Sequence, residues 1–405
     1  MDRRRRHVQL GLIAATQVLG MAMWFSASAV LPALRAAWQL SDLQAGWLTA
    51  SVQVGFVVGA VTSAVLNLPD RFPPQRVAAL AALGAAATTA GVPLFADGFV
   101  PAVLLRLCSG FFLAGVYPVG MKLMASWFGP AGRGLALGVL VGALTVGSAL
   151  PHLINGLGDL PWQGVLFAAA GLGVGAAAVS LTSVRPGPHL SGGGARPRPR
   201  YVLEMFRERG PRLANLGYFG HMWELYALWT WLPSFVSTGV GGGDTTVGLV
   251  VFTAIGVAGL AGCLLGGWAA DRFGRAPAAG TALVTSGACC LASPLVHTAA
   301  WPVLMVVLLV WGATVIADSG VFSTALSEVA DSRYVGTALT AQTAIGFLLT
   351  VVTINLVPLA ADAAGWRYAF LVLAPGPLLG ALAMRTLGKS TPPGARQRDR
   401  AGRMR

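Results

Sequence analysis

Twelve long apolar runs follow one another along the chain, each long enough to cross a lipid bilayer. A spanning helix needs about 20 mostly apolar residues, and hydrocarbon admits only helices and closed barrels. The period-two alternation of barrel strands is not seen. The sequence therefore predicts an all-α membrane protein with twelve transmembrane helices. The runs lie at 8–32, 43–68, 77–96, 99–127, 134–155, 162–184, 213–238, 247–270, 276–297, 301–328, 334–361 and 365–387.

Charged residues are few, and most of them are basic. Charged residues make up 11% of the chain, against about 25% in soluble domains, which excludes a soluble globular protein. The formal net charge is +13. If the helices alternate in direction, most basic residues fall on one side, at both termini, at 185–212 and in the loops after the second, fourth, eighth and tenth helices. The positive-inside rule then predicts cytoplasmic termini in a cell inner (plasma) membrane. Lipid, and not nucleic acid, is the partner that this charge indicates.

Cysteine usage and the N-terminus add two expectations. Cys108, Cys263, Cys289 and Cys290 all lie within predicted helices, so neither a disulfide framework nor a metal cluster is expected. The basic N-terminus and its apolar run are similar to a signal peptide. The run is too long and lacks a small-residue cleavage site, so we predict a retained first helix.

The two halves of the chain repeat one another. Asp70-Arg71-Phe72 recurs as Asp271-Arg272-Phe273, and Leu31-Pro32 recurs as Leu232-Pro233, both 201 residues on. Six helices per copy would make the repeats parallel, about an axis along the membrane normal.

The repeats divide the chain into four parts. We predict a six-helix bundle at 1–184, a cytoplasmic linker at 185–212, a second six-helix bundle at 213–387 and a basic cytoplasmic tail at 388–405. Gly, Pro and Arg keep the linker solvated, so it can act as a flexible tether or as a plain spacer.

The loop after the eighth helix reads GGWAADRFGRAP, which resembles the Gly-x-x-x-Asp-Arg-x-Gly-Arg signature of the major facilitator superfamily. The resemblance covers nearly the whole chain and implies a secondary transporter with two six-helix repeats. The equivalent loop after the second helix, LNLPDRFPPQR, keeps the Asp-Arg pair but lacks the glycines. The gating residues that the resemblance implies are Asp70, Arg71, Gly267, Asp271, Arg272, Gly274 and Arg275.

The fourth helix carries a cation within the membrane. Arg106 lies in RLCSGFFLAGVYP, which resembles a family motif whose arginine faces the cavity. A buried charge is costly and marks a pathway more often than a lipid-facing position, although snorkelling to the interface is the alternative. Lys122, near the other end of this helix, is expected to snorkel as an anchor or to serve the substrate.

Three polar side chains lie deep in apolar helices of the second half. His221 and Glu224 share one face of the seventh helix, and Asp318 is similarly deep in the tenth. An isolated ionised carboxylate there is costly, which favours its protonated form. Glu224 and Asp318 are therefore candidates for proton coupling, with His221 as partner. The rival interpretations are a permanently neutralised structural network and, much less supported, a His-x-x-Glu metal site.

Aromatic residues surround these acids. Trp223 and Tyr226 are expected to line a pocket for an organic ligand or to pack in the core, and Trp24 and Ser28 hold the corresponding place in the first helix. Trp229 and Trp231 are expected near the outer membrane interface.

These observations favour a monomeric, proton-coupled transporter of a small-molecule organic substrate, with no cofactor. No nucleotide-binding Gly-x-x-x-x-Gly-Lys-Ser/Thr loop is present. Arg106 and Lys122 favour an anion, while drug or metabolite efflux by proton antiport stays open. The fifth helix lacks the Gly-Pro-x-x-Gly-Gly kink that the family's drug antiporters carry. A membrane enzyme would need a metal or nucleophile beside the acids, and a transporter-like sensor would need longer loops.

Overall fold

The computed structural model describes residues 3–128, 133–158, 160–190, 199–239, 241, 243–331 and 333–390. These residues form helices joined by turns and short connections. The predicted 185–212 linker and 388–405 tail each lie partly outside the described residues.

In the described residues, the N-terminal half contains six membrane-crossing units. Three units are single helices, one is a helix followed by a short helix, and two are broken into shorter helices. The first unit consists of α1 (Arg3–Met21), α2 (Ser26–Ala29) and α3 (Leu31–Trp38). The others are α4 (Asp42–Leu66) with the short α5 (Leu68–Arg71), α6 (Pro74–Phe95), the pair α7 (Phe99–Leu113) and α8 (Tyr117–Trp127), α9 (Arg133–Leu157) and α10 (Trp162–Thr182).

The C-terminal half repeats this order. Its first unit is α12 (Arg209–Gly239), preceded by the short α11 (Pro199–Arg207). The second is α13 (Asp244–Val251), the π-helix η1 (Phe252–Ala258) and α14 (Gly259–Phe273). The rest are α15 (Arg275–Val296), α16 (Trp301–Ala317) with α17 (Ser319–Val329), α18 (Val335–Ala364), and α19 (Trp366–Ala369) with the 3₁₀ turn η2 (Phe370–Leu373) and α20 (Pro375–Ser390).

The predicted all-α membrane fold of two six-helix repeats is confirmed. Ten of the units are long and apolar enough to cross a membrane by length and composition alone. The two others are the first and seventh units, in which α1 begins with a run of arginines and α12 carries His221 and Glu224.

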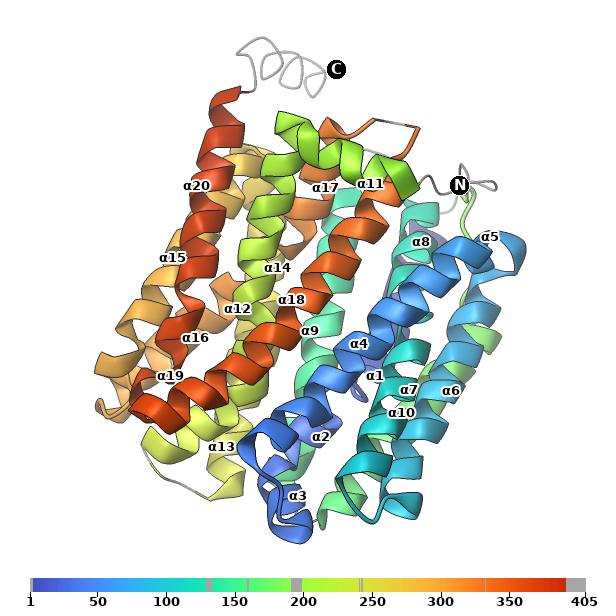
Figure 1. The fold of residues 1–405 in the computed structure, drawn as a ribbon. Coiled ribbons are helices and arrows are strands. Elements are labelled where there is room, and N and C mark those ends of the chain that lie inside the picture. The colour runs from blue at the N-terminus through green and yellow to red at the C-terminus, as the bar shows by residue number, and fades with distance from the viewer. Residues whose placement is uncertain are drawn as a thin grey trace.

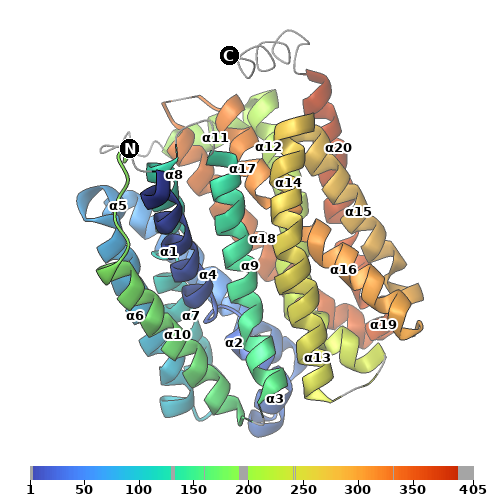
Figure 2. The same cartoon turned by 180° about the vertical axis from the view of Figure 1, so that it is seen from behind.

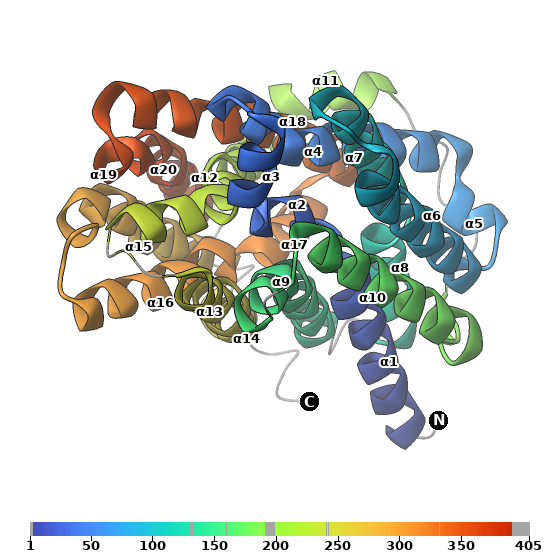
Figure 3. The ribbon, with the colours of Figure 1, turned by 90° about the horizontal axis from the view of Figure 1, so that it is seen from below.

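The two halves lie side by side, with the start of α1 and the end of α20 at one face (Figure 1 and Figure 2). We call this face, which also bears α5 and α11, the terminal face, and the other the opposite face. Across the boundary α4 packs along α18, as Figure 1 shows, and α9 packs along α14, as Figure 2 shows from behind. Figure 3, viewed onto the opposite face, shows the same two bundles.

The halves are in direct contact at the opposite face. A Cβ on Gly248 of α13 would come within 2.5 Å of the backbone oxygen of His152 in α9, so glycine is needed for this approach. A Cβ on Gly46 of α4 would lie 2.9 Å from the side-chain oxygen of Asn355 in α18. Close packing of this kind closes the opposite face between the bundles.

Part of the predicted linker is a docked helix. Tyr201 and Met205 of α11 are buried, while Leu203 is 70% exposed. The Tyr201 hydroxyl accepts a 2.7 Å hydrogen bond from the backbone N–H of Asp331, and burial raises the pKa of Tyr201 above its ordinary value. The hydrogen bond to the uncharged phenol thus connects α11 to the segment between α17 and α18.

Candidate functional site

Glu224 joins three helices of the C-terminal half. Its Oε1 atom accepts hydrogen bonds from Ser286 Oγ at 2.6 Å, Trp311 Nε1 at 2.5 Å and Cys290 Sγ at 3.2 Å. Ser286 and Cys290 lie on α15 and Trp311 lies on α16, whereas Glu224 lies on α12. Three donors on one buried oxygen satisfy this carboxyl and tie the helices together.

His221 and Asp318 form a separate buried pair. The Nδ1 atom of His221 lies 2.9 Å from Oδ1 of Asp318, and both side chains are 1% exposed. Asp318 occupies the break between α16 and α17, and the rings of Tyr218 and Phe322 flank the imidazole. The pair therefore connects α12 to the break in the tenth unit.

The three deep polar residues of the C-terminal half thus divide between two clusters. His221 and Glu224 are one turn apart on α12, but Glu224 bonds to α15 and α16 while His221 faces Asp318. Among the described residues, no group of three His, Cys, Asp or Glu side chains is arranged to hold a metal ion.

Arg106 is fully buried in α7, where it holds the break in the first unit. Its guanidinium donates to the backbone oxygens of Met23, at 2.9 Å, and Trp24, and to Ser26 Oγ at 3.2 Å. The prediction of one continuous helix at 8–32 is wrong here, because residues 22–25 form a turn between α1 and α2. The carbonyl groups that this turn releases are the ones that Arg106 binds.

The aromatic candidates of the two halves meet at their boundary. The ring of Trp24 stacks on Tyr226 with centroids 5.8 Å apart, and Phe347 of α18 packs against both. Ser28 bonds to Thr49 of α4 at 2.5 Å. This cluster connects the turn held by Arg106 with α12.

Three tryptophans of α12 have other surroundings. Trp223 packs against Gly376 and donates a 3.0 Å hydrogen bond to the backbone oxygen of Val372, so it faces the twelfth unit. The expectation of an interfacial belt at Trp229 and Trp231 is wrong, since both are at most 1% exposed and Trp231 donates to Ile354 across the helix interface. Packing of Trp231 against α18 and of Trp229 against Phe25 buries both rings.

The residues for which a gating role is expected lie at the terminal face, in two unlike ion-paired clusters that we call latches. In the N-terminal half, Lys122 of α8 pairs with Asp70 of α5 and donates to the backbone oxygen of Pro69 at 2.7 Å, so it connects α8 to the loop after the second unit. Arg71 and Arg272 are exposed.

In the C-terminal half, Arg275 lies between two acids. It contacts Asp271 at 2.7 Å and Glu328 of α17 at 3.4 Å. Gly274 precedes it with φ +100°, a backbone conformation that favours glycine at the turn between α14 and α15. This latch connects the loop of the signature to the tenth unit.

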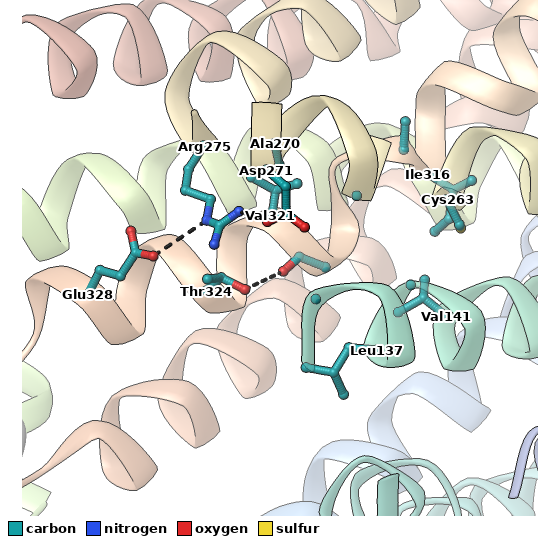
Figure 4. Close-up of a pocket in the computed structure, with 15 residues that line it drawn as sticks. Leu137, Val141, Cys263, Ala270, Asp271, Arg275, Ile316, Val321, Thr324 and Glu328 are labelled. Atoms are coloured by element: carbon teal, nitrogen blue, oxygen red, sulfur yellow. Dashed lines mark hydrogen bonds and ion pairs between the residues drawn. The ribbon is translucent and has the colours of Figure 1, made fainter. Parts of the chain in front are cut away.

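A cavity of about 380 Å³ opens between α9, α14, α16 and α17 (Figure 4). The C-terminal latch stands at its terminal-face end, and Figure 4 shows Arg275 between Asp271 and Glu328 there. The cavity is lined by Gly134, Leu137, Gly138, Val141, Cys263, Gly267, Ala270, Asp271, Arg275, Ile316, Ala317, Gly320, Val321, Thr324 and Glu328.

The sequence profile of the Major Facilitator Superfamily matches residues 13–349 and, in a second match, 214–403. The chain belongs to the major facilitator superfamily. The resemblance suggested by the Asp-Arg-x-Gly-Arg loop is thereby confirmed, as is the expectation of a transporter and not an enzyme. The chain is a multi-pass membrane protein of this family.

Solved structures of superfamily members share the fold over nearly the whole length. A bacterial homologue of the human lysosomal transporter Spinster, inward-facing and unoccupied, is 15% identical with a TM-score of 0.72, over 96% of this chain and 99% of that one. The proton:xylose symporter XylE, bound to 6-bromo-6-deoxy-D-glucose, is 16% identical with a TM-score of 0.72, over 95% and 96%. At this identity the likeness concerns the fold alone.

Two curated relatives match over about half of their lengths. A D-galactonate transporter of Escherichia coli O6:H1 is 26% identical over 208 residues, which is 45% of this chain and 48% of the relative. A probable L-galactonate transporter of Escherichia coli K12 is 28% identical over 200 residues, 44% of each chain.

Sequence reasoning missed several residues of this superfamily member's candidate site. Ser286, Cys290 and Trp311 are neutral residues in apolar helices, and no pattern marks them as partners of Glu224. Cys263 and Glu328 of the cavity were likewise not singled out as site residues. The sequence did contain a signal for the pairing of Asp318 with His221. Both residues lie at similar depths of two helices of the same repeat.

Proposed function

We propose that this protein is a proton-coupled secondary transporter of a small organic anion. It works by alternating access in the inner membrane as a monomer, with both termini in the cytoplasm. The observation that carries the proposal is the buried His221–Asp318 pair at the break of the tenth unit. The basic residues gathered at the terminal face support the orientation.

The pair has the chemistry of a proton carrier. One added proton converts a carboxylate beside an imidazole into either a neutral acid or an imidazolium–carboxylate pair, and this changes the local charge in a buried site. Asp318 links α16 to α17, so its protonation state acts at the break between these two helices. Glu224 is less suited to this role, because its Oε1 already accepts three hydrogen bonds.

The anion is supported by Arg106. Its hydrogen bonds end on neutral oxygens of Met23, Trp24 and Ser26, so its charge is available to compensate a carboxylate. A carboxylate binds the planar guanidinium fork more strongly than backbone carbonyls do. Two relatives named as galactonate transporters point to hydroxylated acids of the sugar-acid class.

Binding at Arg106 would also act on the boundary between the halves. A carboxylate that takes the guanidinium releases the carbonyl groups of the 22–25 turn, and Trp24 in that turn stacks on Tyr226 of the other half. The contact between the halves thus depends on the occupancy of the same arginine. Such a dependence is the kind of differential interaction that drives a change between two states.

Uptake into proteoliposomes tests the proposal. We expect purified protein to accumulate labelled D-galactonate, or another small hydroxy acid, when an inward-directed proton gradient is imposed. A protonophore should abolish accumulation, and a sodium gradient should not replace the proton gradient. Lipophilic cations should not stabilise the protein thermally, whereas a bound anion should. Stabilisation by lipophilic cations, with no response to any organic acid, would overturn the anion assignment in favour of efflux by antiport.

A further inference from the structure

The polar side chains that face the turn at residues 22–25 carry an inference that rests on the proposed function. We propose that the amide of Gln53, with the indole N–H of Trp24, recognises hydroxyl groups of the substrate and makes the site specific for hydroxy acids over plain carboxylates. Gln53 lies on α4, in the same half as Arg106. In this arrangement Arg106 binds the carboxylate, and Gln53 selects what the rest of the substrate carries.

The first argument is that the amide of Gln53 is buried without a hydrogen bond. Its side chain is 0% exposed, and neither Nε2 nor Oε1 has a hydrogen-bonding partner in the part of the chain that the structure describes. A buried polar group without a partner costs free energy, and most buried polar groups in native proteins are paired. A ligand that pairs with both atoms removes this cost.

The second argument is the direction in which Gln53 faces. Thr49 and Phe56, four residues before it and three after it on α4, lie on the same side of the helix. Thr49 bonds to Ser28, and the ring centroid of Phe56 lies 4.9 Å from that of Trp24. Gln53 is therefore directed toward the part of the first unit that carries these two partners.

The third argument is the proximity of Arg106. A Cβ on Gly110 of α7 would lie 2.0 Å from the backbone oxygen of Val52 on α4, so the two helices touch backbone to backbone. Gly110 follows Arg106 by four residues, a rise of about 6 Å. Val52 adjoins Gln53 in the chain. The guanidinium donates to the backbone oxygen of Trp24, so the cation and the amide face the same turn.

The fourth argument is the chemistry of the unpaired atoms. In the described chain, the buried unpaired atoms of these residues are three donors, Gln53 Nε2, Trp24 Nε1 and Arg106 Nε, and one acceptor, Gln53 Oε1. A carboxylate only accepts hydrogen bonds, whereas a hydroxyl both donates and accepts. An ammonium would also donate to Oε1, but the charge of Arg106 repels it. A carboxylate that carries hydroxyl groups is therefore the ligand that matches all four atoms.

Aromatic rings of the C-terminal half cover these atoms. Tyr226 stacks on the ring of Trp24. Phe347 packs against the rings of both Trp24 and Phe56. The substrate therefore reaches Gln53 when these rings move away from Trp24. Hydroxyl recognition is in this way linked to the boundary between the halves, where the two states of the transporter differ.

Binding of matched acids measures the selectivity. D-galactonate is compared with hexanoate, and D-glycerate with propionate, so that the acids of each pair have the same number of carbons and one carboxylate. Affinities come from the ligand-dependent thermal stability of the purified protein. We expect wild type to bind the hydroxy acid of at least one pair at least about tenfold more tightly than its plain partner.

Removal of the amide tests the role of Gln53. Gln53→Leu should weaken binding of the hydroxy acid by at least about tenfold and change binding of the plain acid by less than about twofold. Without ligand, the variant should unfold at a temperature no lower than wild type, because it loses an unpaired polar group. An unchanged preference, or equal weakening of both acids, would overturn the inference. A lower unfolding temperature would show that the amide is paired and structural.

Two further variants separate recognition from packing. Gln17→Leu is the matched control, because Gln17 of α1 is also buried with an unpaired amide nitrogen, while its oxygen lies against Gly120 of α8. A loss of preference as large as that of Gln53→Leu would assign the effect to packing. Trp24→Phe removes the indole N–H and keeps an aromatic ring, so we expect the hydroxy acid to bind about three- to tenfold more weakly. An unchanged preference would contradict the part assigned to the indole.

The two hypotheses fail in different ways. If wild-type protein shows neither binding nor proton-driven uptake of any organic acid, the proposed function fails. If uptake of organic acids is proton-driven but wild type binds plain acids as tightly as hydroxy acids, or Gln53→Leu keeps the preference, the role of Gln53 fails and the proposed function stands.

Discussion

In the N-terminal half the first unit is broken at residues 22–25, and a buried cation, Arg106, binds the backbone oxygens of the break. In the C-terminal half the corresponding helix α12 is continuous and carries its own polar side chains, Glu224 and His221, which bind to neighbouring helices. One repeat buries a positive charge and the other buries acids. We propose that this difference reflects two roles, with the anion bound in the first half and the proton in the second.

Corresponding positions sharpen this contrast. At the 201-residue offset that relates the two Asp-Arg-Phe motifs, Asp318 corresponds to Tyr117. Both residues stand at a break, Tyr117 at the start of α8 and Asp318 between α16 and α17. The same architectural point is thus phenolic in one half and acidic in the other. A duplicated fold keeps the break and changes its chemistry.

The largest expected effect is at this acidic position. Asp318→Asn removes the titrating group but keeps the size of the side chain, so proton-driven accumulation should fall by at least about 100-fold, or about 2.7 kcal/mol. Exchange of anion across the membrane, which moves no net proton, should persist. The control is Asp97→Asn, an exposed acid outside the bundles. Equal activity of the two variants in accumulation would remove Asp318 from the coupling.

Next in size is the cation of the N-terminal half. Arg106→Gln should weaken anion binding by about 10- to 100-fold, because a hydrogen bond to a charged group contributes about 1.5–3 kcal/mol. Thermal stabilisation by the anion gives the affinity, and Arg76→Gln, an exposed arginine at the start of α6, is the control. Retained affinity in Arg106→Gln would place the anion elsewhere.

A smaller effect, on stability and not on coupling, is expected at Glu224. Glu224→Gln weakens the three hydrogen bonds from Ser286, Cys290 and Trp311, at a cost of about 1–3 kcal/mol in unfolding free energy. Proton-driven accumulation per folded molecule should stay within about twofold of wild type. A change of that size is smaller than the tenfold change that corresponds to one pKa unit. Thermal unfolding and uptake are measured on the same preparation, and a loss of coupling like that of Asp318→Asn would assign Glu224 to the proton route.

The smallest effects are expected at the terminal-face latches. Lys122→Met and Glu328→Gln each break a partly exposed ion pair, and such pairs contribute about 0–1 kcal/mol. Unfolding free energies should therefore change by less than about 1 kcal/mol in either half. A larger loss in either variant would show that its ion pair contributes more to stability than an ordinary partly exposed pair.

Much of the fold was predictable, because lipid requires long apolar helices and the duplication is visible in short motifs such as Asp70-Arg71-Phe72. The depth of His221, Glu224 and Asp318 was predictable for the same reason. Their pairing was not, since it depends on helix rotation and on partners 62 to 97 residues away that hydropathy does not encode. Trp229 and Trp231 illustrate the limit, because proximity to a helix end suggested an interface where helix packing buries both rings.

The break at residues 22–25 could not be predicted from hydropathy either. The segment is apolar throughout, and it is the buried guanidinium of Arg106, supplied by another helix, that satisfies the released backbone oxygens. A local sequence pattern does not contain that information.

Proton uptake on anion binding tests the division between the halves most directly. Calorimetric titration of the detergent-solubilised protein with the anion, in two buffers of different ionisation enthalpy, gives the number of protons bound per anion. Linkage requires a nonzero value if the two sites are coupled. The account predicts uptake of up to about one proton in wild type and in Glu224→Gln, and about none in Asp318→Asn, with anion still bound. Undiminished proton uptake in Asp318→Asn would contradict the assignment of the proton to the C-terminal half's His221–Asp318 pair.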